Sequence, residues 1–349
     1  MNRFDYVRPA TIPEAIAAGA MHGAAYLAAG TNLVDLMKGG VMRPGRLVDI
    51  TRLPGLDRIE ALPDGGVRIG MLVRNADLAY DADFARRFPA VAEALLSGAS
   101  AQLRNAATLG GNLLQRTRCA YFYDTASACN KRDPGAGCDA LGGENRLHAI
   151  LGWSEHCIAM HPSDLAVPLA ALGAVVEAEG AGGRRDIPME DFHRLPGTTP
   201  ERETELQPGE LVTAVRLPAD AAGFAGHARY LKVRERTSYA FAVVSAAAAL
   251  RMQDGVIAET RIALGGVALK PWRARAAEAA LAGATPDAGA FRRAAAAALA
   301  DARPSGDNAF KIELARRIVV RALTLAAAGT PQRMPALPAS PFAGASTHV

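Results

Sequence analysis

The first half of the chain alternates short apolar runs with turns, a pattern that predicts strands separated by brief helices. The clearest helix start is TIPEAIAAGAM, where Thr11 suits an N-cap and Glu14 suits the first turn. A second long pattern, FARRFPAVAEALLSGAS, predicts one amphipathic helix that ends near Gly98. The same signals predict strands at residues 25–30, 46–50 and 67–73, a short helix within 31–40, a helix running into a strand at 165–180, and a strand at 210–218.

From about residue 226 the pattern becomes longer and more regular. Residues 228–267 read as a three-stranded meander, and the turn QDG between its second and third strands is a good hairpin signal. Ala-rich helices follow between about 271 and 328, and residues 331–349 form a Pro/Ser-rich tail. The chain is therefore expected to be an α+β protein with mixed sheets.

Length and charge narrow the class of protein. A chain of 349 residues is long for a single core, so two or three subdomains are expected. Its net charge of +4 is spread without a Lys/Arg run, which argues against a nucleic-acid partner. Neither a signal peptide nor a membrane span is evident, so no membrane insertion is expected and the protein is expected to fold in the cytoplasm. A periplasmic location would require export with a signal-bearing partner.

Two glycine-containing loops, AAGTNLVDL (28–36) and TLGGNLLQ (108–115), are suited to hold an anion. Glycine lets the backbone approach a ligand closely, and successive N–H groups form anion-binding nests. Neither loop matches GxGxxG or GxxxxGK[ST], so a Rossmann or P-loop site is not indicated. Taken alone, each loop also fits a simple turn.

All four cysteines fall within one irregular segment, residues 117–157, with the spacing C-x9-C-x8-C-x18-C. Disulfides suit small secreted domains, and structural zinc sites favour C-x2–4-C pairs, which are absent here. Unrelated buried cysteines and a [4Fe–4S] cluster bound by four thiolates stay open. The residues alone do not decide among these alternatives. The four are Cys119, Cys129, Cys138 and Cys157.

Four ordered motifs resemble one family. YLAAGTNLVDLMK, QLRNAATLGGNLLQRTRC, HPSDLAVPLAALGA and YLKVRERTSYAFAVVSAA are similar in order and spacing to the FAD-binding subunits of molybdenum hydroxylases, the xanthine dehydrogenase and carbon monoxide dehydrogenase group. The resemblance covers about residues 1–325. It implies a two-subdomain FAD-binding fold (PCMH/VAO-like) followed by a three-stranded sheet and a helical bundle. The implied boundaries are 1–55 and 56–220 for the FAD subdomains, with an insertion at 117–157, then 221–330 and the tail 331–349.

The resemblance also implies which residues hold FAD. Asp164 would bond ribityl or ribose hydroxyls, although it is equally placed to cap the following helix. Lys232 would lie near the isoalloxazine, although it also fits a solvated strand edge. Ala29 stands where the family usually has glycine, so a positive φ there would require a reshaped loop. The pyrophosphate is implied to contact Ala28, Ala29, Gly30, Thr31, Asn32, Leu33 and Val34 in the first loop and Thr108, Gly111 and Asn112 in the second.

The cysteine segment resembles the flavin subunits of bacterial periplasmic aldehyde oxidoreductases, in which these cysteines bind a [4Fe–4S] cluster. That likeness implies a subunit carrying FAD and [4Fe–4S], with no catalytic residue of its own. Its implied partners are a molybdenum-cofactor large subunit and a [2Fe–2S] small subunit in a heterotrimer. Electrons would pass from the [2Fe–2S] clusters through FAD to an external acceptor. Lys131, Arg132 and Arg146 would offset cluster charge or face solvent, and His156 is the one histidine expected beside the cluster. A self-contained flavoenzyme and a zinc-stabilised interaction protein are the alternatives.

Overall fold

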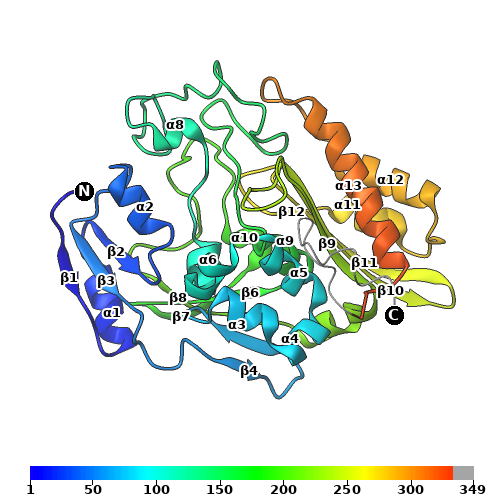
Figure 1. Ribbon diagram of the computed structural model, residues 1–349, viewed down its shortest axis with the longest axis horizontal. Coiled ribbons are helices and arrows are strands. Elements are labelled where there is room, and N and C mark those ends of the chain that lie inside the picture. Colours follow the sequence, from blue (N-terminus) through cyan, green and yellow to red (C-terminus); the bar gives the residue numbers. More distant parts are fainter. Residues whose placement is uncertain (333–349) are drawn as a thin grey trace.

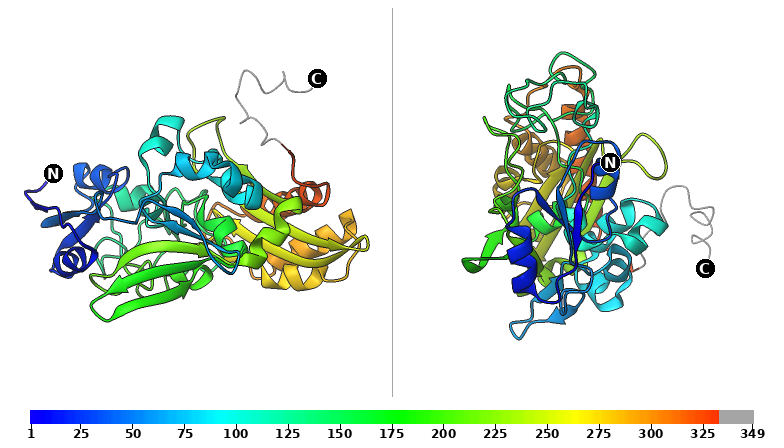
Figure 2. Two further views of the ribbon diagram at one scale, coloured as in Figure 1. Left: turned by 90° about the horizontal axis from the view of Figure 1, so that it is seen from below. Right: turned by 90° about the vertical axis from the view of Figure 1, so that its left-hand side faces the viewer.

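The computed structural model describes residues 1–332, and their elements form three sheets with helices packed around them (Figure 1). The N-terminal sheet lies at one end of the molecule and the last helices at the other. Figure 2 shows the same elongated order in two further views. The predicted tail lies outside the described residues from 333 onward.

The N-terminal sheet is parallel, with the order β1-β3-β2. Thr11 caps the first helix as predicted, because its hydroxyl accepts the Glu14 N–H at 3.3 Å. The strand at 46–50 and the short helix within 31–40 are also confirmed. The elements are β1 (Asp5–Val7), α1 (Ile12–Gly19), β2 (Ala24–Leu27), α2 (Leu33–Lys38) and β3 (Arg46–Asp49).

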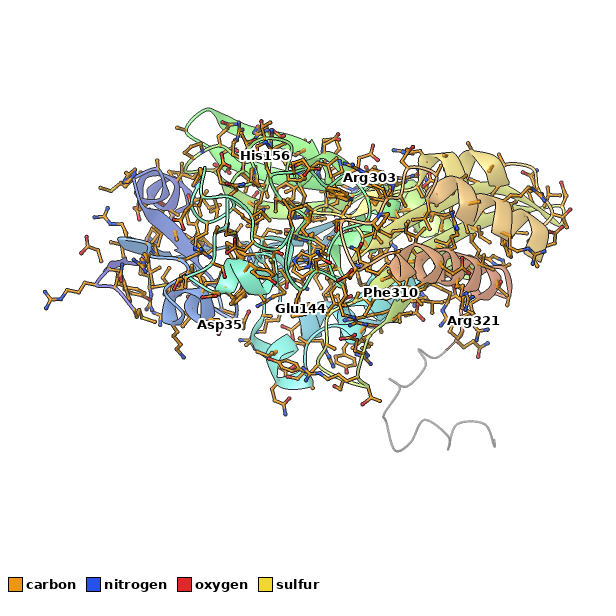
Figure 3. The ribbon with its side chains drawn as sticks, turned by 90° about the horizontal axis from the view of Figure 1, so that it is seen from above. Asp35, Glu144, His156, Arg303, Phe310 and Arg321 are labelled. Carbon is orange, nitrogen blue, oxygen red and sulfur yellow. The ribbon has the colours of Figure 1, made fainter. Side chains whose placement is uncertain are left out.

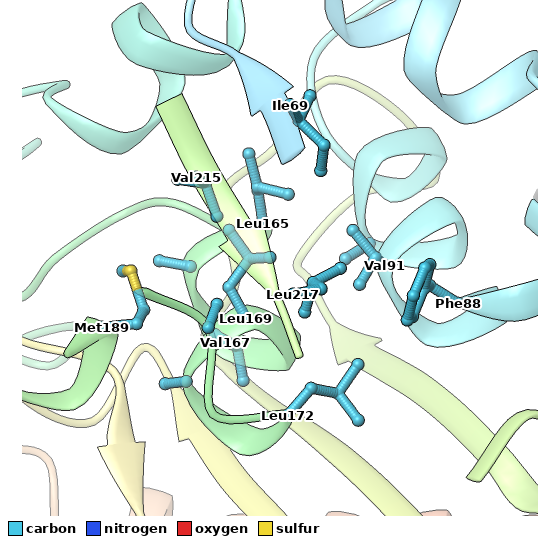
Figure 4. Packing of buried hydrophobic residues seen from close by; sticks show 14 of the residues in the cluster. Ile69, Phe88, Val91, Leu165, Val167, Leu169, Leu172, Met189, Val215 and Leu217 are labelled. Atoms are coloured by element: carbon cyan, nitrogen blue, oxygen red, sulfur yellow. The ribbon is translucent and has the colours of Figure 1, made fainter. Parts of the chain in front are cut away.

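The second sheet is antiparallel, with the order β4-β5-β8-β6-β7. Its strands and the helices packed on it enclose the largest core, which includes Ile69, Val91, Leu169 and Val215 (Figure 4). The strands are β4 (Ile59–Ala61), β5 (Val67–Gly70), β6 (Val175–Gly180), β7 (Gly183–Pro188) and β8 (Leu211–Leu217). The helices are α3 (Asn75–Tyr80), α4 (Ala82–Arg87), α5 (Pro89–Ser97), α6 (Ala101–Ala106), α7 (Leu109–Leu113), α9 (Ala166–Ala171) and α10 (Met189–Phe192).

The single helix predicted from residue 84 is wrong in one respect: the structure divides it into α4 and α5. Phe88 leaves the helical region with φ −133° and ψ 59°, and Pro89 begins α5 at its first position. Proline has no N–H to continue the preceding helix, and it disfavours helical geometry in the residue before it. The break turns α5 so that Pro89 to Leu95 are all buried.

The C-terminal sheet contains the expected three-stranded meander, and a two-residue strand extends it to the order β12-β11-β10-β9. The hairpin turn at Asp254 and Gly255 has positive φ at both positions, as a type I′ turn requires. Three helices cover one face and build a second core with the sheet. The elements are η1 (Ala219–His227), β9 (Ala228–Val233), β10 (Val244–Gln253), β11 (Val256–Gly265), β12 (Trp272–Arg273), α11 (Arg275–Leu281), α12 (Ala288–Ala298) and α13 (Phe310–Ala327).

Segment 117–157 forms the lobe around α8 (Ala120–Tyr123) and has no other helix or strand (Figure 1). Its later part is fastened to the C-terminal domain. Lys311 at the start of α13 is fully buried and donates to the carbonyls of Leu147 at 3.0 Å, His148 at 2.7 Å and Gly266 at 2.7 Å. The segment is therefore positioned by long-range contacts.

The α+β class is confirmed, but the expectation of mixed sheets is wrong, because the N-terminal sheet is wholly parallel and the other two sheets are wholly antiparallel. The boundaries predicted at 55, 220 and 330 stay predictions. Within the described part of the chain, no helix has both the length and the apolar character needed to cross a membrane.

Candidate functional site

The loop between β2 and α2 is shaped by Gly30, which has φ +75°. A Cβ at Gly30 would lie 2.8 Å from Cγ2 of Val34, so both conformation and space favour glycine. Ala29 has no positive φ, and the alanine therefore requires no special backbone. Asn32 Oδ1 accepts the backbone N–H of Arg116 at 2.9 Å, which ties this loop to the chain that follows α7. Asn32 Nδ2 is buried without a partner among the described residues, so it is available to a ligand.

The second predicted loop forms the start of α7. Thr108 caps this helix by accepting the N–H of Gly111 at 3.2 Å. Asn112 Oδ1 accepts the Ser163 hydroxyl at 2.8 Å, which brings the HPSD motif beside the loop. Two sequence motifs separated by about fifty residues thus meet at one place.

Both loops border a cavity of about 680 Å³, a volume within the range of cofactor sites. The predicted residues that line it are Thr31, Asn32, Gly111, Asn112, Asp164 and Lys232. The other predicted residues of the two loops, Ala28, Ala29, Gly30, Leu33, Val34 and Thr108, do not line the cavity; of these, Gly30 and Thr108 shape the loops that do. This space is called the flavin cavity because six of its lining residues are among those implied for FAD.

Asp164 and Lys232 form a buried ion pair in this cavity, with Lys232 Nζ 2.7 Å from Asp164 Oδ2. The Tyr230 hydroxyl donates to the other carboxylate oxygen at 2.5 Å. Burial and the neighbouring carboxylate raise the pKa of Tyr230 well above its usual value, so it stays a donor. The helix-cap alternative for Asp164 fails, because the Ser163 hydroxyl accepts the Ala166 N–H at 3.2 Å instead. The solvated strand-edge alternative for Lys232 fails as well, since its side chain is 4% exposed.

Several cavity residues were not predicted. Arg118 lies over the Phe241 ring, 4.8 Å from its centroid, and donates to the Tyr123 hydroxyl at 2.6 Å. Tyr239 has φ +52°, a left-handed conformation rare for a large side chain and typical of functional positions. The motif YLKVRERTSYAF contains this loop, and its mixture of charges and aromatic residues directly after Lys232 was the available signal. The unpredicted residues on this side are Arg118, Glu235, Arg236, Tyr239 and Phe241.

All four cysteines line a second, small cavity, here called the cysteine cavity. They are free thiols, and Cys129 and Cys157 are buried. The structure therefore brings together the whole predicted set, as short antiparallel bridges pair Cys129 with Cys138 and Ser154 with Cys157. Within residues 1–332, however, no three His, Cys, Asp or Glu side chains are grouped tightly enough to hold a metal ion.

The environment of these thiols is apolar. Burial raises the pKa of Cys119 to about 12 and that of Cys157 to about 11. Lys131, with a side chain only 1% exposed, also lines the cysteine cavity, and its charge opposes this rise at Cys157. Lys131 pairs with Glu203 at 2.9 Å. The thiols would ionise on binding a cation, which replaces the missing solvation of the thiolate.

The other two basic residues predicted for this segment, Arg132 and Arg146, make structural contacts. Arg132 donates to the carbonyls of Tyr121, Phe122 and Asp124 at 2.9 Å each, so it shapes the cysteine-bearing loop. Arg146 pairs with Glu235, which joins the segment to the loop beside the flavin cavity.

Within the described residues, His148 is the histidine that hydrogen-bonds a cysteine sulfur. Its Nε2 lies 3.2 Å from Cys119 Sγ, and its side chain is buried. His156 borders the cysteine cavity too, but it is an exposed residue, and in Figure 3 it lies on the opposite side of the ribbon from Asp35. The sequence predicts His156 beside the cluster and does not reveal the contact of His148, because that contact depends on tertiary structure.

Comparison with known families agrees with this geometry. The family model described as the FAD binding domain in molybdopterin dehydrogenase matches residues 2–220. The model of the CO dehydrogenase flavoprotein C-terminal domain matches residues 229–326. Together they span the flavin cavity and the sheet that carries Lys232. The chain belongs to the family of FAD-binding subunits of molybdenum hydroxylases, and the predicted family, FAD-binding fold and oxidoreductase class are confirmed.

Individual relatives extend over nearly the whole chain. The aldehyde oxidoreductase FAD-binding subunit PaoB of Escherichia coli (strain K12) is 50% identical over 333 residues, covering 94% of this chain and 99% of that protein. A carbon monoxide dehydrogenase from Hydrogenophaga pseudoflava, lacking the Mo-pyranopterin moiety, has a TM-score of 0.73 at 30% identity, with 94% of this chain and 98% of that one covered. Quinoline 2-oxidoreductase from Pseudomonas putida 86 has a TM-score of 0.72 at 26% identity, with the same coverage.

Proposed function

We propose that this chain is the electron-transfer subunit of an aldehyde-oxidising molybdenum hydroxylase complex and that it binds FAD and a [4Fe–4S] cluster. The observation that carries the proposal is the proximity of two sites: a cavity built from the FAD-binding loops, and four free cysteines around a neighbouring cavity. The 50% identity to an aldehyde oxidoreductase FAD-binding subunit supports the choice of branch within the family.

The residues of the flavin cavity fit FAD. Backbone N–H groups near Gly30 and Gly111, with the unpartnered Asn32 amide, are suited to the pyrophosphate oxygens. Lys232 supplies a buried cation beside Asp164, and a cation near the isoalloxazine favours the anionic reduced form. When bound, FAD would exchange electrons singly or in pairs; the chain's own residues bind and orient it and keep water from its ring.

The cysteine cavity fits a cluster by its donor set. Four free thiols line one cavity without forming disulfides, and irregular backbone surrounds them, as iron–sulfur clusters require. Lys131 places a buried positive charge in the same wall. A single zinc ion is the alternative occupant of four thiolates.

The partners in this proposal are a molybdenum-cofactor large subunit, where the aldehyde is oxidised, and a [2Fe–2S] small subunit, together forming a heterotrimer. Electrons would arrive from the [2Fe–2S] clusters and leave this subunit to an external acceptor. The relatives include an FAD-binding subunit and a medium chain, which supports a multi-subunit assembly.

The test is the visible spectrum of the purified protein together with iron, sulfide, zinc and flavin analysis. We expect flavin bands, broad iron–sulfur absorbance, and about four iron and four sulfide per chain. Cys138→Ser should lose iron, whereas the exposed neighbour Asp133→Asn should keep it. Flavin without iron would favour a self-contained flavoenzyme, and zinc without flavin would favour an interaction protein; either result contradicts the proposal.

A further inference from the structure

Cys119 occupies the wall between the two cavities. Thr117 and Cys119 are the two residues that line both the flavin cavity and the cysteine cavity. His148 lines the flavin cavity and lies against the sulfur of Cys119, with 3.2 Å between Nε2 and Sγ. Of the four cysteines, Cys119 is therefore the one that stands between the proposed cluster and the proposed flavin.

The contact between His148 and Cys119 is unusual among the cysteines of this chain. Within residues 1–332 it is the one side-chain hydrogen bond to a cysteine sulfur. The sulfur of Cys157 is approached by a backbone group, the N–H of Ala159, at 3.5 Å. An imidazole at this position supplies a side-chain donor in addition to the backbone N–H groups of Tyr121 and Phe122 that approach the same thiol.

His148 is held in place from the C-terminal domain. Its carbonyl oxygen accepts Lys311 Nζ at 2.7 Å and Asn308 Nδ2 at 3.0 Å, and its N–H donates to Asn145 O at 2.9 Å. Asn308 and Lys311 are both fully buried. The backbone of His148 is consequently anchored by residues outside the cysteine-bearing loop, so the position from which its ring reaches Cys119 does not depend on that loop alone.

The chemistry of a metal-bound cysteine decides which atom of this contact donates the hydrogen bond. A metal-bound cysteine is a thiolate and can only accept, so Nε2 of His148 must carry the proton and donate it toward Sγ. Hydrogen bonds to the sulfurs are among the factors that set the reduction potential of an iron–sulfur cluster. A donor stabilises the reduced cluster more, because reduction adds negative charge to the sulfurs, and its loss lowers the potential.

We propose that His148 is a positioning residue that donates Nε2–H to the Cys119 thiolate, thereby raising the reduction potential of the cluster and holding this ligand in the wall that faces the flavin cavity. The inference rests on the proposed function, since it needs a cluster at these four cysteines. It assigns to His148 a role that concerns the cluster and is separate from FAD binding.

The test is a redox titration of the cluster, followed by EPR, on the full chain purified with the subunits that accompany it. His148→Leu removes the donor and should shift the reduction potential downward, whereas His148→Gln, which keeps an N–H donor, should restore most of the shift. His22→Gln is the matched control and should leave the potential at the parent value, since His22 is exposed and lines neither cavity. An unchanged potential in His148→Leu would overturn the inference.

A second measurement covers the case in which His148→Leu fails to assemble the cluster. With ¹⁵N-labelled histidine, pulsed EPR of the reduced parent should show a weak histidine nitrogen coupling that persists in His156→Gln. Absence of that coupling overturns the inference. If the parent contains iron but shows neither the potential shift nor the nitrogen coupling, only the role of His148 is refuted. If the parent contains no iron, the proposed function is refuted as well.

Discussion

Lys232 and Asp164 both line the flavin cavity and form an ion pair there, with 2.7 Å between Nζ and Oδ2 and side chains only 4% and 8% exposed. The two residues come from different domains. Asp164 lies before α9 in the FAD-binding domain, and Lys232 lies on β9 in the C-terminal domain. Lys232 also donates to the carbonyl of Ser97 at 3.2 Å. These contacts account for two of its three donors, which leaves one for a ligand.

Lys232→Met should therefore weaken both folding and FAD retention. Removing one member of a buried pair leaves the other charge unpaired, at a cost of about 3–5 kcal/mol. Thermal unfolding should show this loss, and flavin absorbance should show a lower FAD content. The double variant with Asp164→Asn should regain most of the stability but not the FAD, because the cation is still missing.

The exposed Lys38→Met on α2 is the matched control for Lys232→Met, and it should leave both quantities unchanged. Lys232→Met with parental stability and full FAD content would show that the pair contributes to neither.

Local signals in the sequence were sufficient for much of the fold. Thr11, the Asp254–Gly255 turn and the apolar residues of β8 act over a few residues, and each element was predicted from its neighbours alone. The break at Pro89 was a local signal that the apolar periodicity on both sides concealed.

The candidate site was predicted from family motifs, so contacts between residues that lie in different loops were not predicted. The meeting of Asn32 with Arg116 and of His148 with Cys119 joins residues far apart in sequence. No periodicity or spacing encodes such contacts, because they arise when separately formed loops are packed against the C-terminal domain. Tyr239 was missed for a related reason: its left-handed backbone becomes visible only in the folded loop.

Gly30→Ala should impair FAD binding with little effect on the rest of the fold. The new Cβ would require a left-handed alanine and would lie 2.8 Å from Val34 Cγ2. We expect about 1–2 kcal/mol of strain in this loop, hence a roughly tenfold weaker FAD affinity measured by flavin titration of the apoprotein. Gly45→Ala is the control, since its Cβ meets nothing within 4 Å. Equal affinities in the two variants would contradict the assignment of the first loop to FAD.

Two buried histidines should make the protein sensitive to acid. The rings of His161 and His193 lie 4.1 Å apart, and His193 Nε2 bonds the Leu113 carbonyl at 2.9 Å. Burial lowers the pKa of His193 to about 4 and that of His161 well below its usual value of 6.5. A lowered folded-state pKa means that the unfolded chain binds protons first, so stability present above pH 6.5 is lost as the pH falls toward 4.

For His193 alone the loss amounts to about 3 kcal/mol across that window, taking about 1.4 kcal/mol for each pH unit. Thermal unfolding between pH 7.5 and 4.5 measures it. His193→Gln should show a shallower decline than the parent, whereas the exposed His22→Gln should follow the parent curve. Parallel curves for His193→Gln and the parent would exclude this source of acid sensitivity.

Lys311 should make the free energy of unfolding depend on pH above neutrality. Burial lowers the pKa of Lys311 from 10.5 to about 7, although three carbonyl oxygens bind its ammonium group. Between these two pH values the unfolded chain holds a proton that the folded chain has released, so this residue makes the free energy of unfolding rise with pH. The rise is at most about 5 kcal/mol, at about 1.4 kcal/mol for each pH unit, and the carbonyl contacts reduce it because they favour the charged form.

Lys311→Met removes this titration, so the free energy of unfolding of the parent minus that of the variant should increase between pH 7 and 9.5. Chemical denaturation at several pH values measures the difference directly, and Lys38→Met provides the level expected from an exposed lysine. A difference that stays constant with pH would mean that Lys311 remains charged throughout, held by the carbonyls of Leu147, His148 and Gly266. In that case the same three bonds would anchor His148 as an ion–dipole contact, and Lys311→Met should then loosen the Cys119 contact at every pH.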